Sequence, residues 1–98
     1  MSGLDPLRSR LDEIDVQLLA LLGERFAVCR EIAAFKSAHD IAMMQPRRVE
    51  EVRARYVTGG AQAGMPDGFA NALFELLIDA TCRMEDQLIA AASDRTTA

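Results

Sequence analysis

Two cations on one predicted helical face are the clearest sign of chemistry in this chain. Arg25 stands in a row of otherwise apolar residues, and Lys36 follows it eleven positions later. At 100° per residue the two side chains fall within about 20° of each other, about 16 Å apart along a helix axis. An unpaired guanidinium in a helical interface is costly, so Arg25 requires either an internal carboxylate partner or an anionic ligand. Together the two cations suit a small molecule with an anionic group at each end.

A third cation and a carboxyl group extend this pattern. Arg8 lies about 25 Å along the same predicted helix from Arg25, too far to bind the same small ligand within one chain. In an antiparallel dimer it would reach the ligand of the partner, whereas taken alone it is an ordinary surface residue. Thr81 and Glu85 stand four residues apart, on one helical face. Glu85 is expected to hydrogen-bond a ligand, to form a salt bridge with Arg25 or Arg48, or simply to be solvated.

The apolar residues around Arg25 predict one very long first helix. They recur at alternating spacings of four and three, which is typical of one face of a helix. At the start, Asp5 and Pro6 predict an N-cap followed by a first-turn proline. At the end, the apolar pattern stops in the polar stretch 37–40. A helix of about 33 residues is about 50 Å long, whereas a compact chain of this size has a radius of gyration of about 13 Å. The far half must pack on another surface, so we predict an intertwined homodimer. The apolar stripe consists of Leu7, Leu11, Ile14, Leu18, Leu21, Val28, Ile32 and Phe35.

Two further helices are expected, which makes the fold class all-α with three helices per chain. The second begins at Pro46 and is expected to end at the glycine pair 59–60. The third is expected to begin near Pro66 and Asp67, with a frayed tail from Ser93. We interpret residues 1–98 as a single domain.

Composition limits the classes of function. Half of the 98 residues are hydrophobic, which is sufficient for one domain with its own core. No apolar run is long enough to span a bilayer and no export signal is seen, so we expect a cytoplasmic protein. The formal net charge of −4 argues against nucleic-acid binding. Cys29 and Cys82 belong to no metal or redox motif; we expect both to be buried, reduced core thiols and expect no metal site.

The order and spacing of these residues resemble the AroQ family of chorismate mutases. The similarity begins with Leu-Leu-Ala-Leu-Leu-Gly-Glu-Arg at 18–25 and Ile-Ala-Ala-Phe-Lys at 32–36, and it continues through Gln-Pro-Arg-Arg-Val at 45–49 and segment 74–87. It therefore covers nearly the whole chain. The resemblance implies an all-helical, dimeric isomerase that needs no cofactor and rearranges a chorismate-like dicarboxylate.

The resemblance also implies roles for individual residues. Arg25 and Arg48 would bind substrate carboxylates, and Arg8 would bind the other carboxylate from the partner subunit. Lys36 and Glu85 would be the catalytic groups that flank the ether oxygen, and Lys36 would also contact a substrate carboxylate. Glu85 must carry a proton in order to donate a hydrogen bond. The other substrate contacts expected from the resemblance are Met44, Gln45, Val49 and Thr81.

Two positions depart from the ordinary mutase pattern. Gln45 stands where the family has Asp, and Val49 stands where it has the Glu that contacts the ring hydroxyl of the substrate. The loss of that carboxylate favours a substrate with a changed ring substituent. Isochorismate pyruvate-lyases also carry Val here, whereas the 4-amino-4-deoxychorismate mutases of antibiotic pathways resemble segments 43–49 and 82–86 as well.

We therefore predict a [3,3]-sigmatropic rearrangement of 4-amino-4-deoxychorismate to 4-amino-4-deoxyprephenate. The sequence leaves three alternatives open. The chain could be an ordinary chorismate mutase that produces prephenate, an isochorismate pyruvate-lyase, or a non-enzymatic helical dimerisation module.

Overall fold

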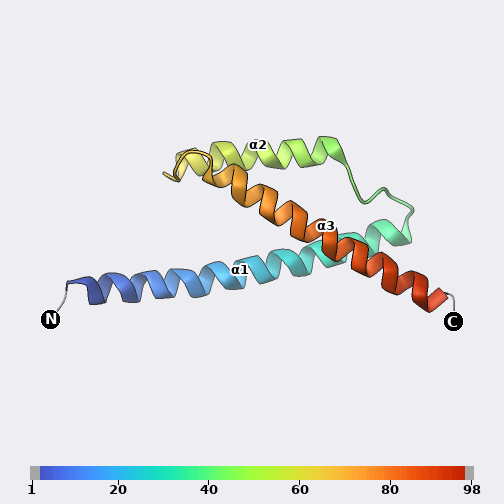
Figure 1. Ribbon diagram of the computed structural model, residues 1–98, viewed down its shortest axis with the longest axis horizontal. Helices are drawn as coiled ribbons and strands as arrows, with labels where there is room; N and C mark the ends of the chain where they lie inside the picture. The colour runs from blue at the N-terminus through green and yellow to red at the C-terminus, as the bar shows by residue number, and fades with distance from the viewer. Residues whose placement is uncertain (1–2, 97–98) are drawn as a thin grey trace.

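Three α-helices make up the computed structural model, which describes residues 3–96 (Figure 1). They are α1 (Leu4–Ala38), α2 (Pro46–Gln62) and α3 (Phe69–Thr96). No strand occurs over the described residues, so the predicted all-α class with a very long first helix is confirmed. None of the three helices, as far as they are described, is both long and apolar enough to cross a membrane.

The first helix begins earlier than predicted. Gly3 occupies the N-cap position, where no side chain caps the helix, so the prediction of Asp5 as the N-cap is wrong. Asp5 lies in the first turn instead, where a carboxylate interacts favourably with the positive end of the helix dipole. At the other end, the backbone N–H of His39 donates to the carbonyl oxygens at the end of α1. Asp40 then adopts a left-handed φ of 54°, which turns the chain away from the helix axis.

The predicted end of the second helix at the glycine pair is also wrong, because α2 continues to Gln62. Gly60 is required by packing rather than by a helix end: a Cβ atom added there would lie 2.4 Å from the Cβ atom of Ala70 on α3. The turn that follows uses left-handed glycines, with φ of 79° at Gly64 and 81° at Gly68. Helix α3 then starts at Phe69, slightly later than expected.

The tail predicted to fray from Ser93 is helical through Thr96. That prediction is therefore wrong for residues 93–96, while residues 97–98 lie outside the described part of the chain.

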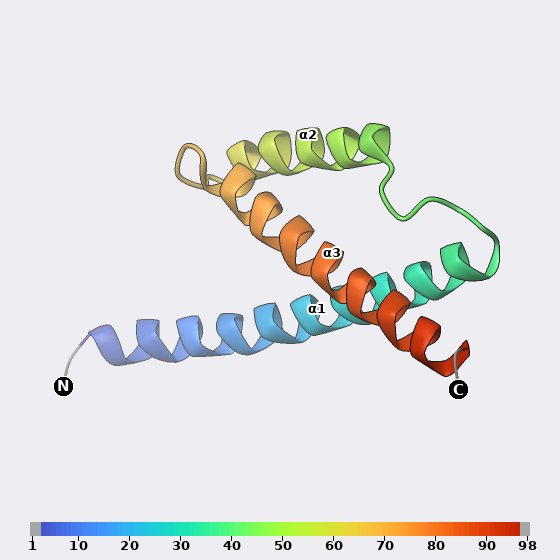
Figure 2. The same cartoon turned by 45° about the vertical axis from the view of Figure 1, so that its right-hand side comes forward.

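Helix α3 is the element that holds the other two together. It packs along α2 and crosses the C-terminal half of α1 (Figures 1 and 2). Over the described residues no α-carbon of α2 lies within 8 Å of α1, so these two helices are joined only through α3 and the connection 39–45. The small core follows this arrangement, with Phe74 and Leu77 buried on α3 and Ala33 buried on α1.

The apolar stripe predicted for α1 is largely uncovered in a single chain. Its eight side chains are between 46% and 63% exposed. The N-terminal half of α1 extends beyond the other two helices (Figure 1), and the radius of gyration is 17.8 Å. A compact chain of this length has a value of about 13 Å. One chain therefore leaves a long apolar helical face without a packing partner among the described residues.

Candidate active site

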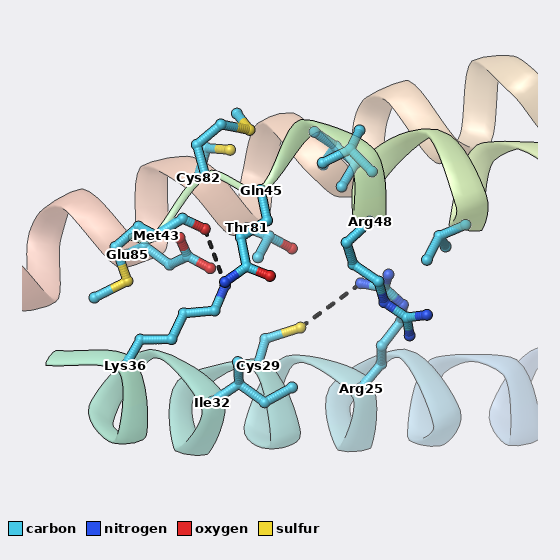
Figure 3. Close-up of a pocket in the computed structure, with 14 residues that line it drawn as sticks. Arg25, Cys29, Ile32, Lys36, Met43, Gln45, Arg48, Thr81, Cys82 and Glu85 are labelled. Atoms are coloured by element: carbon cyan, nitrogen blue, oxygen red, sulfur yellow. Dashed lines mark hydrogen bonds between the residues drawn. The ribbon is translucent and has the colours of Figure 1, made fainter. Parts of the chain in front are cut away.

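One pocket, of about 390 Å³, lies where α1, the connection 39–45, α2 and α3 meet (Figure 3). Each element contributes side chains because the crossing of α3 over α1 leaves the start of α2 facing α1 across a gap. Eight of the nine residues predicted to contact a substrate line this pocket. They are Arg25, Lys36, Met44, Gln45, Arg48, Val49, Thr81 and Glu85. The ninth, Arg8, is exposed near the start of α1 and lies outside it.

Arg25 faces the pocket without a carboxylate partner. Its side chain is half-buried, and over the described residues no carboxylate oxygen lies within 4 Å of it. Its Nη1 atom instead lies 3.8 Å from the Sγ atom of Cys29, one helical turn further along α1. A thiol is a weak acceptor and does not neutralise a guanidinium. Of the two possibilities for Arg25, an anionic ligand and an internal carboxylate, the geometry favours the ligand.

Arg48 approaches Arg25 from the opposite wall. Figure 3 shows its side chain extending from α2 toward α1, so that the two guanidinium groups lie at the same end of the pocket. Among the described residues its only ion pair is with Glu51, at 3.8 Å, and its side chain is 58% exposed. Such a long, exposed pair contributes little stability and is readily exchanged for another carboxylate. Two neighbouring cations without a buried counter-charge form a suitable site for an anion.

Lys36 and Glu85 lie toward the other end of the pocket (Figure 3). The Nζ atom of Lys36 donates a hydrogen bond of 2.9 Å to the carbonyl oxygen of Met43. An ammonium group has three donors, so two stay available for a ligand. Glu85 is half-buried, forms no ion pair over the described residues, and is the only carboxylate in the lining. The salt bridge that was considered between Glu85 and Arg25 or Arg48 is therefore not formed.

Thr81 is buried on α3, and its hydroxyl group donates a hydrogen bond of 2.8 Å to the carbonyl oxygen of Leu77. This bond lies within the helix and uses the hydroxyl proton. The oxygen of Thr81 can still accept a hydrogen bond from a ligand that donates.

Sequence reasoning missed several lining residues, and the prediction that both cysteines are buried core thiols is wrong. Cys29 and Cys82 are only half-buried and both line the pocket. Their helical spacing was an available signal, because Cys29 follows Arg25 by four residues and Cys82 precedes Glu85 by three. Burial is the largest cause that raises the pKa of the Cys82 thiol, and the nearby carboxylates of Glu85, Asp86 and Asp79 raise it further. The other lining residues missed are the apolar Ile32, Met43, Val52 and Ile78.

The pocket thus combines three cations with one carboxyl group and apolar walls. This set of groups can hold a small dianion and stabilise negative charge that develops on a ligand oxygen. The described side chains offer two anion-binding positions inside the pocket, one beside the two arginines and one beside Lys36. Binding a dianion and stabilising charge on its oxygen require no nucleophile, because the pocket side chains act through their charge and by orienting the ligand.

Comparison with known proteins shows the family of the chain. Residues 7–86 match the sequence profile of the family described as chorismate mutase type II. The chain is 39% identical over 88 residues to a 4-amino-4-deoxychorismate mutase of Streptomyces pristinaespiralis, an alignment that covers 90% of this chain and 68% of that protein. It is 36% identical over 90 residues to a 4-amino-4-deoxychorismate mutase of Streptomyces venezuelae, covering 92% of this chain and 87% of that protein. No solved structure is significantly similar to the chain.

Proposed function

Because the chain belongs to the type II chorismate mutase family, we propose that it is the isomerase that converts 4-amino-4-deoxychorismate to 4-amino-4-deoxyprephenate. The observation that carries this proposal is the pocket in which Arg25, Arg48 and Lys36 gather, with no ion pair to another lining residue over the described part of the chain. A dicarboxylate supplies the missing counter-charges. The two relatives that carry the name of this activity support the choice of the amino substrate.

The two arginines account for the binding of one substrate carboxylate. Arg25 projects from α1 and Arg48 from α2, so a carboxylate between them would join two helices whose described α-carbons nowhere lie within 8 Å of each other. Planar guanidinium groups match a carboxylate with two parallel hydrogen bonds, which orients the substrate as well as attracting it. The second substrate carboxylate would then lie toward the other end of the pocket.

The reaction itself moves electrons within the substrate. In the [3,3]-sigmatropic rearrangement, the enolpyruvyl ether C–O bond breaks while a new C–C bond forms across the ring. Negative charge grows on the ether oxygen as that bond breaks. The Lys36 ammonium and a protonated Glu85 would donate hydrogen bonds to this oxygen and stabilise the charge. The cations at the two ends would hold the substrate in the folded conformer that reacts.

The wall near Gln45 and Val49 is where the ring substituent would be distinguished. Val49 is half-buried and lines the pocket next to Arg48 on α2. It offers no hydrogen-bonding group, while the Gln45 amide offers both an acceptor and donors. A neutral amide at this place accepts a hydrogen bond from an amino group without requiring a second carboxylate in the pocket.

We further propose that the working enzyme is a homodimer in which Arg8 completes the site of the partner subunit. The exposed stripe on α1 supports this arrangement, because eight apolar side chains on one helix are left uncovered. Arg8 also lies outside its own chain's pocket, at the far end of the same helix. Antiparallel pairing of two α1 helices would bring this end of one chain to the pocket of the other.

A side-by-side turnover assay tests the proposed reaction. Chorismate, 4-amino-4-deoxychorismate and isochorismate are supplied in turn, and the isomeric products are separated by chromatography and identified by NMR. We expect the highest kcat/KM for the amino substrate, with the rearranged amino product. Preferential formation of prephenate would make the chain an ordinary chorismate mutase, and pyruvate with salicylate from isochorismate would make it a lyase. The absence of any reaction would overturn the proposal.

A further inference from the structure

The pocket-facing part of α2 depends on α3 for its position. Arg48, Val49 and Val52 line the pocket from α2, yet over the described residues no α-carbon of α2 lies within 8 Å of α1. The irregular connection 39–45 joins the two helices at one end only. The separation between Arg48 and the cations on α1 is therefore set by how α2 is held on α3.

One polar cluster joins α2 to α3. The Arg53 guanidinium on α2 donates a hydrogen bond of 3.0 Å to the side-chain oxygen of Asn71, and a second hydrogen bond to Glu75, both on α3. Its central carbon lies 5.0 Å from the ring centroid of Phe74, which is fully buried. Glu50 on α2 adds an ion pair at 3.4 Å. The guanidinium is thus held by charge, by hydrogen bonds and by a cation–π contact at once.

This cluster differs from the other ion pairs of the described chain. Arg47, Arg48 and Arg83 each pair with a carboxylate three or four residues away in the same helix. Arg53 alone among the described residues forms an ion pair between two helices. Its side chain is only 26% exposed, and the hydrogen bond to Glu75 raises its pKa. An arginine is in any case charged at every pH at which the protein would be assayed. The pair also lies close to the pocket, about 7.5 Å along the α2 axis from Arg48.

We infer that Arg53, held by Glu75 and Asn71, is a positioning residue that fixes the start of α2 so that Arg48 faces Arg25 across the pocket. Arg53 does not line the pocket and touches no substrate in this scheme. It acts through the placement of Arg48. The inference rests on the proposed function for its effect on turnover, while its effect on α2 is independent of the identity of the substrate.

The first test follows the backbone. Hydrogen–deuterium exchange is compared for the wild type, Arg53→Met and Arg55→Met. Methionine keeps an apolar stem over Phe74 but removes the charge and the donors. Arg55 is the matched control, because it is an exposed arginine on the same helix that forms no ion pair with any described residue. We expect faster exchange over residues 46–56 in Arg53→Met, little change in α1, and wild-type exchange in Arg55→Met.

The second test asks whether Arg53 acts through Arg48. Kinetic constants are measured for Arg53→Met, Arg48→Met and the double variant, with the best substrate of the wild type. We expect Arg53→Met to lower kcat/KM about tenfold, mainly through KM, because a small displacement of a binding group weakens orientation of the substrate. In the Arg48→Met background the same change should cost less than about twofold, since the group that it positions is already absent.

The outcomes separate the possibilities. Unchanged exchange in α2 would overturn the inference, and so would losses in kcat/KM that multiply independently, because these would show that Arg53 only stabilises the fold. Rescue by Arg53→Lys, to within about threefold of the wild type, would support the role of the charge. A wild type inactive on all three substrates would overturn the proposed reaction, and the exchange measurement alone would then support or overturn the positioning of α2.

Discussion

The Lys36 ammonium donates a hydrogen bond of 2.9 Å to the carbonyl oxygen of Met43. A second bond of 2.9 Å, from the backbone N–H of Ile41 to the carbonyl oxygen of Lys36, closes the same turn from the backbone side. The cation that we place at the ether oxygen therefore also orders the connection that carries Met44 and Gln45 into the pocket. Binding and loop placement are coupled at this residue.

Replacing Lys36 is expected to remove most of the activity. In Lys36→Met the stem is kept, but the charge facing the ether oxygen and the bond to Met43 are lost. We expect kcat to fall by about 100-fold to 1,000-fold, the range found when one donor to a developing oxyanion is removed. Steady-state kinetics provide the measurement. Arg47→Met serves as the control, because Arg47 is almost fully exposed and lies outside the pocket; similar kcat values for the two variants would contradict the role of Lys36.

Glu85 offers a test of hydrogen-bond donation. Glu85→Gln keeps the shape of the side chain and supplies an amide that donates at every pH, whereas Glu85→Ala removes the donor. We expect the glutamine variant to retain at least the wild-type kcat near neutral pH and the alanine variant to lose about 100-fold. If the alanine variant equals the glutamine variant in turnover, Glu85 does not act at the ether oxygen.

The shared site of the proposed dimer is tested by mixing two inactive variants. Arg8→Ala and Arg25→Ala each damage both sites of their own homodimer. In a mixed dimer one site receives an intact Arg25 from one chain and an intact Arg8 from the other. Random exchange of equal amounts should restore about a quarter of the wild-type activity, because half of the dimers are mixed and each has one intact site of two. Persistent inactivity after subunit exchange has been demonstrated would argue against a shared site.

Periodicity was sufficient to predict the three helices, because apolar spacing reports directly on which face of a helix can be buried. It predicted helix ends less well. Gly59 and Gly60 were interpreted as a stop, yet α2 continues because Gly60 meets Ala70 of α3, a tertiary contact that the local sequence does not contain. Likewise Asp5 has the type of an N-cap residue, but α1 begins at Leu4, one residue before it.

The pocket was predictable where charge broke the apolar pattern. Arg25 and Lys36 are unusual on one helix and Glu85 was a candidate from its spacing to Thr81, whereas the substrate-binding role of Arg48 and the catalytic role of Glu85 came from the resemblance to a family. The cysteines were assigned to the core because a thiol without a motif behaves as a small apolar group. Their place in the lining depends on the crossing of α3 over α1. The role inferred for Arg53 depends on three side chains of another helix and has no signal in its own segment.

Cys82 supplies a prediction about pH. Burial and the nearby carboxylates raise the pKa of its thiol, so less thiolate is present at a given pH than in a free cysteine. In a Cys29→Ser variant, which leaves Cys82 as the only thiol, we expect alkylation by iodoacetamide to be slow near neutral pH. The midpoint of its rate-against-pH curve should lie above that of free cysteine. Mass spectrometry follows the adduct. A midpoint at or below that of free cysteine would show that burial and the nearby carboxylates do not raise the pKa of Cys82.

A saturating amount of substrate or of a slowly released product should slow the alkylation of Cys82, because the thiol lines the pocket. Iodoacetamide is the appropriate probe because it is neutral, so attraction by the pocket cations does not distort the comparison. Equal rates with and without ligand would place the bound molecule elsewhere.

The neighbouring glycines of α2 provide a matched pair for stability. A Cβ atom at Gly60 would lie 2.4 Å from the Cβ atom of Ala70 and 3.3 Å from the sulfur of Met65, whereas nothing lies within 4 Å of a Cβ atom at Gly59. Both positions are helical, so both gain about 0.5 to 1 kcal/mol in helix propensity when alanine replaces glycine. We expect Gly59→Ala to raise the free energy of unfolding by about that amount. Gly60→Ala should instead lower it, because α2 and α3 must separate to admit the methyl group, at a cost of about 1 to 3 kcal/mol from which the propensity gain is subtracted.

Urea denaturation at a fixed protein concentration measures this difference and keeps any contribution from dimerisation constant. The kinetic constants of the same two variants connect packing to the site. If α3 holds the start of α2 over the pocket, Gly60→Ala should also raise KM, while Gly59→Ala should leave KM unchanged. Equal stabilities for the two variants would mean that Gly60 of α2 does not lie directly against Ala70 of α3. The distance between Arg48 and Arg25 would then have to be set by another contact.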